Sequence, residues 1–219
     1  YAEHVAVDEV SFEVPRGAVY GLLGRNGAGK TTTIRMLMDI LRPDSGELSI
    51  FGQAPRGALL DKVGYLPEER GLYKRMYVID VLVYLGGLKG VPAADARQRA
   101  TQWLERVELG GWEKRKVEEL SKGMQQKVQF ISTLLARPEL LILDEPFSGL
   151  DPVNTNQLRD IFLEISRAGT TILFSTHQME SAERLCDAIC IINKGRVVEE
   201  GPVARVREKY GRNNVALEF

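Results

Sequence analysis

Hydrophobic and polar positions along the chain follow two different periods, which divide the sequence into three parts. Residues 5–23 and 46–66 carry short apolar or alternating runs bounded by Gly and Pro, a pattern typical of strands. Residues 78–136 instead repeat apolar side chains every three or four positions, which predicts three amphipathic helices. Strand-like runs then resume, with helical segments between them, at 140–143, 171–174, 188–192 and 196–198.

This alternation of strands and helices predicts an α/β fold. We expect a mostly parallel sheet flanked by helices, a small antiparallel β part at the N-terminus, and an inserted α-helical lobe. The tripeptide Asn193-Lys194-Gly195 lies between the last two strand-like runs and suits a tight hairpin turn. These last two strands are therefore expected to be antiparallel neighbours.

The first candidate functional motif is a glycine-rich segment between a predicted strand, 19–23, and a predicted helix, 32–41, which Arg42-Pro43 should end. Its glycines allow backbone N–H groups to surround phosphate oxygens, and the helix start adds partial positive charge. Chance would produce this G-x-x-x-x-G-K-[ST] pattern about once in 30,000 windows of average composition. A nucleoside triphosphate site is therefore predicted, with Lys30 on the β/γ-phosphates and the Thr31 hydroxyl on Mg²⁺. The motif comprises Gly24, Arg25, Asn26, Gly27, Ala28, Gly29, Lys30 and Thr31.

Two further polar groups follow apolar strands at the edge of the sheet where the phosphate-binding loop should lie. The run Leu140–Leu143 ends in Asp144, which can hold Mg²⁺, and Glu145, which can accept a proton from an attacking water. The run 171–174 leads to Ser175-Thr176-His177, which places His177 near the γ-phosphate. Each group alone would more often be structural. Their combination with the phosphate-binding loop favours a catalytic site.

Two more segments have sequences that are typical of helix starts. Ser121 precedes a long helical pattern as an N-cap, and Asp151-Pro152 resembles an N-cap followed by Pro at the first helical position. A helix start is also an anion site, so a phosphate could dock at Ser121. For each segment, a capping role and a functional role both stay open at this point.

Together, these motifs resemble the nucleotide-binding domain of ATP-binding cassette (ABC) proteins. The most specific one is Leu-Ser-Lys-Gly-Met-Gln (120–125), which lies upstream of the Asp-Glu strand as the family signature does. Segments 65–73 and 120–127 are most similar to bacterial export ATPases of the sodium/drug-efflux type. The resemblance implies one nucleotide-binding domain over residues 1–219. Its P-loop NTPase core would comprise 1–73 and 137–219, and its inserted helical subdomain 74–136.

The resemblance also implies roles for individual residues. Tyr1 matches the aromatic residue that stacks on adenine, and Thr32 joins Lys30 and Thr31 in holding phosphates and Mg²⁺. Asp144 would be the metal residue, Glu145 the catalytic base and His177 the switch histidine. Across a dimer interface, Ser121 and Gly123 would contact the γ-phosphate bound to a partner subunit, and Asp151 would reach over the same interface.

The sequence departs from the family pattern at three positions. Glu68 stands where Gln usually senses Mg²⁺ and the attacking water; it can ligate Mg²⁺, but its charge repels the γ-phosphate unless it is screened. The adjacent Glu69 leaves a one-residue shift open. Lys122 and Met124 replace the usual Gly and Gln, and Lys122 could approach the partner's phosphates or point to solvent, which we favour.

Composition narrows the cellular setting. With 29 Lys and Arg against 30 Asp and Glu, the net charge of −1 implies no broad basic face, so no nucleic acid partner is expected. No apolar run approaches the ~20 residues of a membrane span, and we expect no signal peptide. Cys186 and Cys190 could form a disulfide, but two buried thiols are favoured.

Since family members carry a strand before Tyr1, we expect a longer natural chain.

The resemblance implies an ATPase that binds ATP and Mg²⁺ and energises transport, with export expected. Two such domains, in a homodimer or a heterodimer, would sandwich ATP and move separate transmembrane permease subunits. The protein would then lie peripherally on the cytoplasmic face of the cell membrane. The alternative is a soluble ABC ATPase that acts on DNA or ribosomes. Only about 90 residues separate Lys30 from Ser121, without sustained heptads, which disfavours the long coiled coil of chromosome-maintenance members.

Overall fold

The computed structural model of the chain describes residues 5–69 and 71–210. Within these ranges one sheet has the strand order β2-β3-β4-β1-β5-β6. Its strands are β1 (Val19–Leu23), β2 (Val63–Leu66), β3 (Leu140–Asp144), β4 (Thr171–Thr176), β5 (Ala188–Asn193) and β6 (Arg196–Pro202). The α-helices are α1 (Lys30–Leu37), α2 (Val78–Leu88), α3 (Ala93–Arg106), α4 (Lys122–Leu134), α5 (Pro152–Arg167), α6 (Met179–Leu185) and α7 (Val203–Tyr210). Two 3₁₀ helices, η1 (Gly57–Lys62) and η2 (Val117–Glu119), complete the set.

The sheet is parallel except at one edge, as the alternation predicted. Strands β2, β3, β4, β1 and β5 run in the same direction, with Leu66 opposite Leu143 and Asp144 opposite Ser175. Strands β5 and β6 pair antiparallel, with Asn193 opposite Arg196, so the expected hairpin is confirmed. The carboxyl ends of the parallel strands meet at one edge, which collects the loops after β1, β2, β3 and β4.

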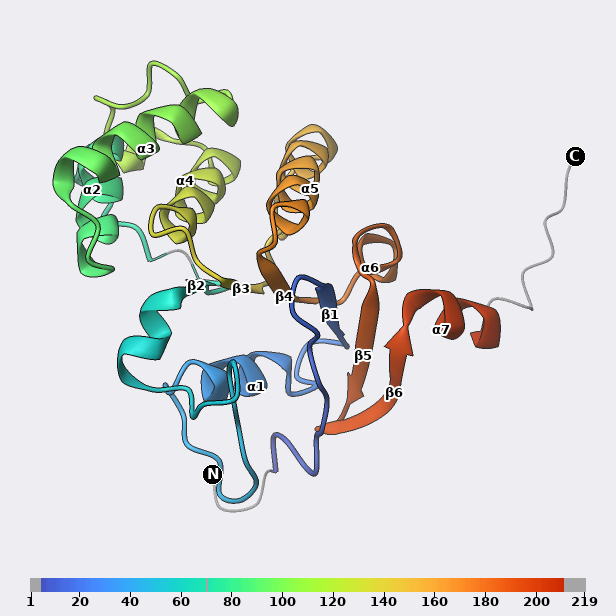
Figure 1. Cartoon of the computed structure of the whole chain (residues 1–219). Coiled ribbons are helices and arrows are strands. Elements are labelled where there is room, and N and C mark those ends of the chain that lie inside the picture. Colours follow the sequence, from blue (N-terminus) through green and yellow to red (C-terminus); the bar gives the residue numbers. More distant parts are fainter. Residues whose placement is uncertain (1–4, 70, 211–219) are drawn as a thin grey trace, which may run out of the picture.

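Both faces of the sheet are covered, because successive strand residues point to opposite sides. Leu141 and Leu143 of β3 pack into a large core with α2, α4 and α5, while Leu140 and Ile142 pack into a second core with α1. Figure 1 shows the arrangement, with α4, α5 and α6 above the sheet and α1 below it. This two-sided burial explains why the strands read as continuous apolar runs.

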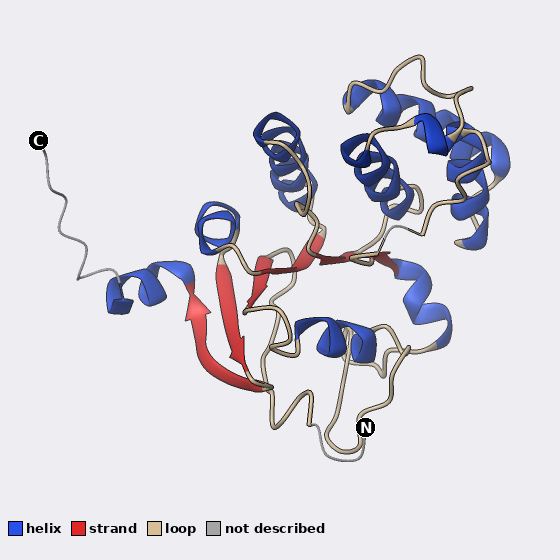
Figure 2. Cartoon of the chain, turned by 180° about the vertical axis from the view of Figure 1, so that it is seen from behind, coloured by secondary structure: helices blue, strands red, loops and turns tan. Residues whose placement is uncertain are grey.

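Helices α2, α3 and α4 pack together beside the sheet, as seen from behind in Figure 2. Two cations tie α3 to α4 through backbone carbonyls. Lys127 Nζ donates to Val107 O at 3.0 Å, which caps the end of α3, and Arg99 donates to Leu135 O at 2.6 Å, which caps the end of α4. Burial lowers the pKa of Lys127. The ties hold the orientation of α4, whose first turn carries the signature residues.

The helix after the phosphate-binding loop ends earlier than its apolar pattern predicted. Helix α1 stops at Leu37 rather than Leu41, because Asp39 adopts a left-handed conformation, with φ at 55°. The amide of Asp39 then donates to Met36 O at 3.1 Å, and that of Ile40 donates to Arg35 O at 2.9 Å. This is a Schellman C-cap with Asp in the position that Gly usually occupies.

The prediction of a small antiparallel β part near the N-terminus is wrong for the described residues. Residues 5–14 form no strand, and residues 46–52 contribute one isolated bridge, between Ile50 and Gln53. Both segments line a cavity of about 580 Å³ together with α1 and the sheet, and no described ladder or bridge joins their backbones. Their apolar side chains still pack on the core; Phe12, for example, stacks on Tyr20 at 5.7 Å.

The two cysteines are free thiols, as favoured from their spacing. Cys190 is fully buried in β5 and Cys186 is partly buried. Burial raises the pKa of both thiols, that of Cys190 to about 12, so neither is a reactive thiolate near neutral pH.

Candidate functional site

The phosphate-binding loop joins β1 to α1 as predicted, and two of its glycines are required by close approaches. A Cβ on Gly24 would lie 2.4 Å from Ile192 O, and one on Gly29 would lie 2.6 Å from Ala6 O. Gly29 also has φ at 113°, which strains any other residue. The loop tip, Arg25 to Gly27, is exposed, whereas Ala28 and Gly29 are buried. The backbone therefore presents an exposed turn in front of a helix N-terminus, as anion binding needs.

Lys30 lies at the centre of this arrangement and is only 5% exposed. Its ammonium donates to Gly24 O at 2.7 Å and forms an ion pair with Glu145, 3.3 Å from Oε1. The carbonyls of the loop and a buried carboxylate thus share one positive charge. Thr31 and Thr32 follow in the first turn of α1 and are half-buried.

Glu145 connects three elements of the sheet edge. It follows β3, is 7% exposed, and has a positive φ of 49°, a conformation that costs energy for a non-glycine residue. His177, which follows β4, lies with Nδ1 3.1 Å from both Glu145 oxygens. Although β4 separates β3 from β1 in the sheet, Lys30 and His177 both reach Glu145. The structure thus brings together the three residues predicted to be catalytic.

Asp144, at the end of β3, is fully buried, and only one of its two carboxylate oxygens has a hydrogen-bond partner. Its Oδ1 accepts a hydrogen bond from Ser175 Oγ, while Oδ2 has no hydrogen-bond partner. The backbone N–H of Glu145 donates to the same Ser175 Oγ, at 3.0 Å. Ser175 therefore fixes both carboxylate-bearing residues, a role that was missed in the sequence. The unpaired, buried Oδ2 fits a cation or a cation-bound water.

The signature residues form a second group, together with Asp151. Ser121 caps α4 by accepting from the Met124 N–H at 3.2 Å, and Asp151 caps α5 by accepting from the Asn154 N–H at 3.0 Å. Both predicted N-caps are therefore confirmed. A Cβ on Gly123 would lie 3.5 Å from Leu150 and 3.8 Å from Asn154, so the two helix starts are neighbours.

The side chains of this second group face water. Ser121, Lys122 and Asp151 are exposed, and Gly123 is partly exposed. Hydrogen bonds from the backbone and side chain of Asn154 hold the pKa of Asp151 below its usual value. Among the described residues, no hydrogen bond or ion pair links this group to Lys30 or Glu145.

Of the remaining predicted residues, Glu68 belongs to neither group. Glu68 follows β2 and is exposed, like Glu69. No three His, Cys, Asp or Glu side chains in residues 5–69 and 71–210 lie close enough together to hold a metal by themselves. Tyr1 lies outside the described residues. Tyr65, two residues before Pro67, has a raised pKa, chiefly from burial and then from the charge of Asp144.

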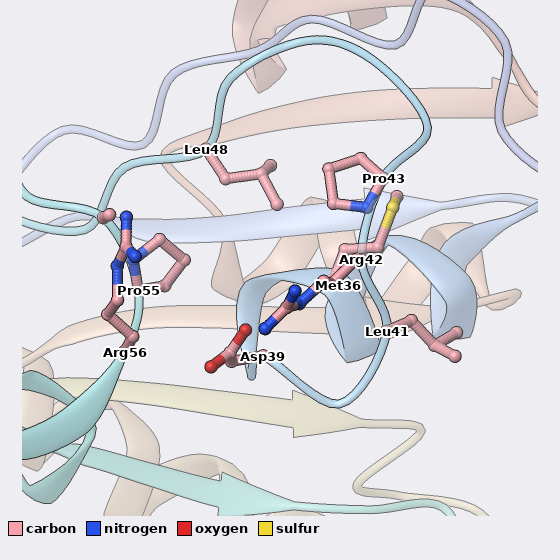
Figure 3. A pocket seen from close by; sticks show the side chains of 9 residues that line it. Met36, Asp39, Leu41, Arg42, Pro43, Leu48, Pro55 and Arg56 are labelled. Atoms are coloured by element: carbon pink, nitrogen blue, oxygen red, sulfur yellow. The ribbon is translucent and has the colours of Figure 1, made fainter.

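A separate pocket of about 290 Å³ lies at the opposite end of α1 from the phosphate-binding loop. Figure 3 shows Asp39 and Arg42 among the side chains that line it, with Pro55 and Arg56 on its other side. None of the predicted site residues lines this pocket. The candidate site instead lies at the sheet edge, where loops follow β1, β3 and β4.

A phosphate-binding loop, a buried Asp-Glu pair on a neighbouring strand, and a parallel sheet covered by helices define a P-loop nucleoside triphosphatase. Comparison with known proteins specifies its family. The sequence profile of the family described as ABC transporter matches residues 7–148. The chain therefore belongs to the ABC transporter family and is an ATP-binding, ATP-hydrolysing subunit.

Individual relatives agree with this assignment. The chain is 48% identical over 217 residues to the uncharacterized ABC transporter ATP-binding protein YhaQ of Bacillus subtilis, covering 99% of this chain and 73% of that protein. It is 39% identical over 206 residues to the Nod factor export ATP-binding protein I of Cupriavidus metallidurans, covering 92% and 67%. A solved ATP-binding subunit of an ABC transporter superposes with a TM-score of 0.86 at 33% identity, covering 99% of this chain and 91% of that one. In the part of the chain that the structure describes, no helix has the length and apolarity needed to cross a bilayer.

Proposed function

We propose that this chain energises export through separate membrane subunits, working as one half of a dimer of nucleotide-binding domains. The observation that carries the hydrolytic part is the buried Glu145, held between Lys30 and His177. A buried carboxylate with a lysine and a histidine beside a phosphate-binding loop is positioned to act on the terminal phosphate of ATP. Similarity to a protein named for Nod factor export supports the direction of transport.

In the proposed site, the backbone from Gly24 to Gly29 surrounds the phosphates, and Lys30 neutralises the β- and γ-phosphate charge. Thr31 and Thr32 add hydroxyl groups at the start of α1. Glu145 accepts a proton from the attacking water, and His177 orients that water or contacts the γ-phosphate. We propose that Tyr1 stacks on the adenine.

Mg²⁺ fits the residues present. The unpaired Oδ2 of Asp144 and the hydroxyl of Thr31 supply hard oxygen donors, which Mg²⁺ prefers, and substrate phosphates complete its shell. A bound Mg²⁺ would neutralise charge that develops on the β- and γ-phosphate oxygens. Glu68 is proposed as a further, water-mediated ligand.

We propose that the second group of residues completes the site of a partner subunit. Ser121, Gly123 and Asp151 are exposed or partly exposed around two helix N-termini, which suits phosphate binding from outside the chain. They make no described link with Lys30 or Glu145. In a head-to-tail dimer, each ATP would lie between one phosphate-binding loop and the partner's signature, in a homodimer or a heterodimer.

The permease contact is proposed for the helical subdomain, residues 74–136, and the segment before it; residues 1–73 and 137–219 form the ATP-binding core. Tyr73, Tyr77, Tyr84 and Leu88 are each 44–64% exposed on α2 and the preceding loop. Tyr73 and Tyr84 form an edge-to-face pair at 5.4 Å. Exposed aromatic clusters of this kind are enriched at protein interfaces. This docking would place the protein peripherally, on the cytoplasmic face of the membrane.

The experiment that tests the catalytic assignment is Glu145→Gln. The variant keeps the shape of the side chain but removes the base, so turnover should fall by about 10²- to 10⁴-fold. ATP binding should persist, and ATP should convert the variant into a stable dimer, measured by light scattering after size-exclusion chromatography. Glu139→Gln, at the opposite and exposed end of β3, is the matched control and should hydrolyse ATP normally. Normal turnover in Glu145→Gln would refute the role given to Glu145.

A further inference from the structure

Two glutamines on α4 are buried among apolar side chains, although the helix could have carried apolar residues there. Gln126 is 2% exposed and Gln129 is 5% exposed, and Val128, Phe130 and Ile131 around them are fully buried. Residues three apart share a helix face, so both amides project from the same side of α4. Burial of a side-chain amide is costly unless it is hydrogen-bonded, so the partners of these amides indicate their purpose.

Both partners are backbone carbonyls in loops that carry the acidic residues of the site. Gln126 Nε2 donates to Pro146 O at 3.2 Å, directly after Glu145. Gln129 Nε2 donates to Glu69 O at 3.1 Å, directly after Glu68. Because β2 and β3 are parallel neighbours, the loops that follow them leave the sheet side by side. Helix α4 therefore holds the two loops at fixed positions relative to each other.

The Gln129 amide costs stability, because only its donor group is hydrogen-bonded. Its Oε1 is buried and has no hydrogen-bond partner, and an unsatisfied buried acceptor destabilises the folded state. An apolar side chain of the same size would avoid that cost and would pack among the neighbours of α4. Only the hydrogen bond to Glu69 distinguishes the amide from such a side chain.

We propose that Gln129 is a positioning residue that fixes the loop after β2 and thereby sets where Glu68 stands relative to Asp144. The proposal rests on the role given above to Glu68 as a water-mediated Mg²⁺ ligand. Glu68 is exposed and is not part of a preformed metal cluster, so its own side-chain contacts do not fix its place. The backbone of Glu69, anchored by Gln129, fixes the place of Glu68 instead. Since Ser121 caps the start of α4, the same helix connects the signature to this loop.

The test is Gln129→Met in the full chain, because Met has a similar volume and removes both the donor and the unpaired acceptor. The thermal unfolding midpoint should stay the same or rise. The Mg²⁺ concentration for half-maximal hydrolysis should rise by about tenfold, as for other outer-shell partners of metal ligands. Binding of a fluorescent ATP analogue without Mg²⁺ should not change. Gln129→Leu, a second variant without a donor, should shift the Mg²⁺ dependence in the same direction.

Lys89→Met is the matched control. Lys89 donates to Leu60 O and Val63 O, at 2.8 and 3.2 Å, and so holds the opposite end of β2. Its loss should lower the unfolding midpoint and leave the Mg²⁺ dependence unchanged. A second comparison adds Gln129→Met to Glu68→Ala. If Gln129 acts through Glu68, the shift in Mg²⁺ dependence should largely disappear in that background.

Two results would overturn the proposal. One is a lower unfolding midpoint in Gln129→Met with wild-type Mg²⁺ dependence, which would make Gln129 a structural residue. The other is a full Gln129→Met effect in the Glu68→Ala background, which would show that it does not act through Glu68. Glu145→Gln measured in parallel separates this outcome from failure of the proposed catalytic site, since that variant must lose turnover whatever Gln129 does.

Discussion

At the scale of single residues, the site is organised by buried groups that share few hydrogen-bonding partners. Glu145 is buried with a positive counterion, Lys30, which offsets the cost of removing the carboxylate from water. Asp144 has one oxygen satisfied by Ser175 and one that is unpaired. Ser175 contacts both residues, so a single hydroxyl holds the Asp144 side chain and the Glu145 backbone together.

Ser175→Ala should therefore affect both stability and turnover. The change leaves Asp144 Oδ1 and the Glu145 N–H without partners, which should cost roughly 1–3 kcal/mol of unfolding free energy. The rate of ATP hydrolysis per folded molecule should fall as well, because the two carboxylates lose their common anchor. Urea unfolding and steady-state hydrolysis measure the two effects.

Thr171→Val, at the other end of β4, is the control for Ser175→Ala. Thr171 accepts a hydrogen bond from the Gly17 N–H at 2.9 Å, far along the strand from Asp144. Its loss should lower stability without changing turnover. Equal turnover in Ser175→Ala and the wild type would mean that Ser175 has no part in positioning the carboxylates.

At the scale of elements, α4 is the helix on which the arrangement depends. It begins with the exposed signature, is tied to α3 by Lys127 and Arg99, and packs closely against the edge strand β2. At Gly64 of β2, a Cβ would lie 2.6 Å from the backbone oxygen of Thr133 in α4. The absence of a side chain at Gly64 therefore lets the helix lie against the sheet.

Gly64→Ala should push α4 away from β2. Since the new Cβ meets backbone as well as Leu141, neither of which can move cheaply, we expect a loss of about 1–3 kcal/mol in unfolding free energy. Gly87→Ala is the control, because Gly87 lies inside α2 with nothing within 4 Å of its would-be Cβ. It should instead stabilise the chain, by roughly 0.5–1 kcal/mol. Equal stability of the two variants in chemical unfolding would contradict the close packing of α4.

At the scale of the whole molecule, the phosphate-binding residues and the signature residues form two separate groups on one chain. The first contains Lys30, Glu145 and His177, and the second contains Ser121, Gly123 and Asp151. In the proposed function, each group presents part of an ATP site. A second copy, or a related subunit, is the partner that would complete both.

The composite site predicts complementation between two inactive variants. Lys30→Ala removes the phosphate contact of one half, and Gly123→Asp places a negative charge where the partner's γ-phosphate should dock. Each variant alone should hydrolyse ATP poorly. If the chain forms homodimers, a mixture of the two contains dimers with one intact site, so its activity should clearly exceed that of either variant. No recovery in a mixture shown to exchange subunits would argue against the composite site.

The sequence by itself predicted the features that depend on local order. The phosphate-binding loop, the strand that ends in Asp144-Glu145, the two N-caps at Ser121 and Asp151, and the β5–β6 hairpin were all found, because their residues are neighbours in the chain. Apolar periodicity placed the sheet and the helical segment for the same reason. It failed at the end of α1, where Asp39 adopts a conformation that usually marks Gly, and at residues 5–14, where an alternating pattern packs on the core without pairing.

Only the tertiary structure decided which distant groups meet. The contacts of Ser175 with Asp144, of Gln129 with Glu69, and of Lys30 and His177 with Glu145 join residues that are 31 to 115 positions apart along the chain. Strand order and helix packing create these contacts, and neither leaves a local signal in the sequence. The sequence therefore determined that the chain binds and hydrolyses ATP, while the fold decided how its buried amides and hydroxyls hold the acidic residues in place.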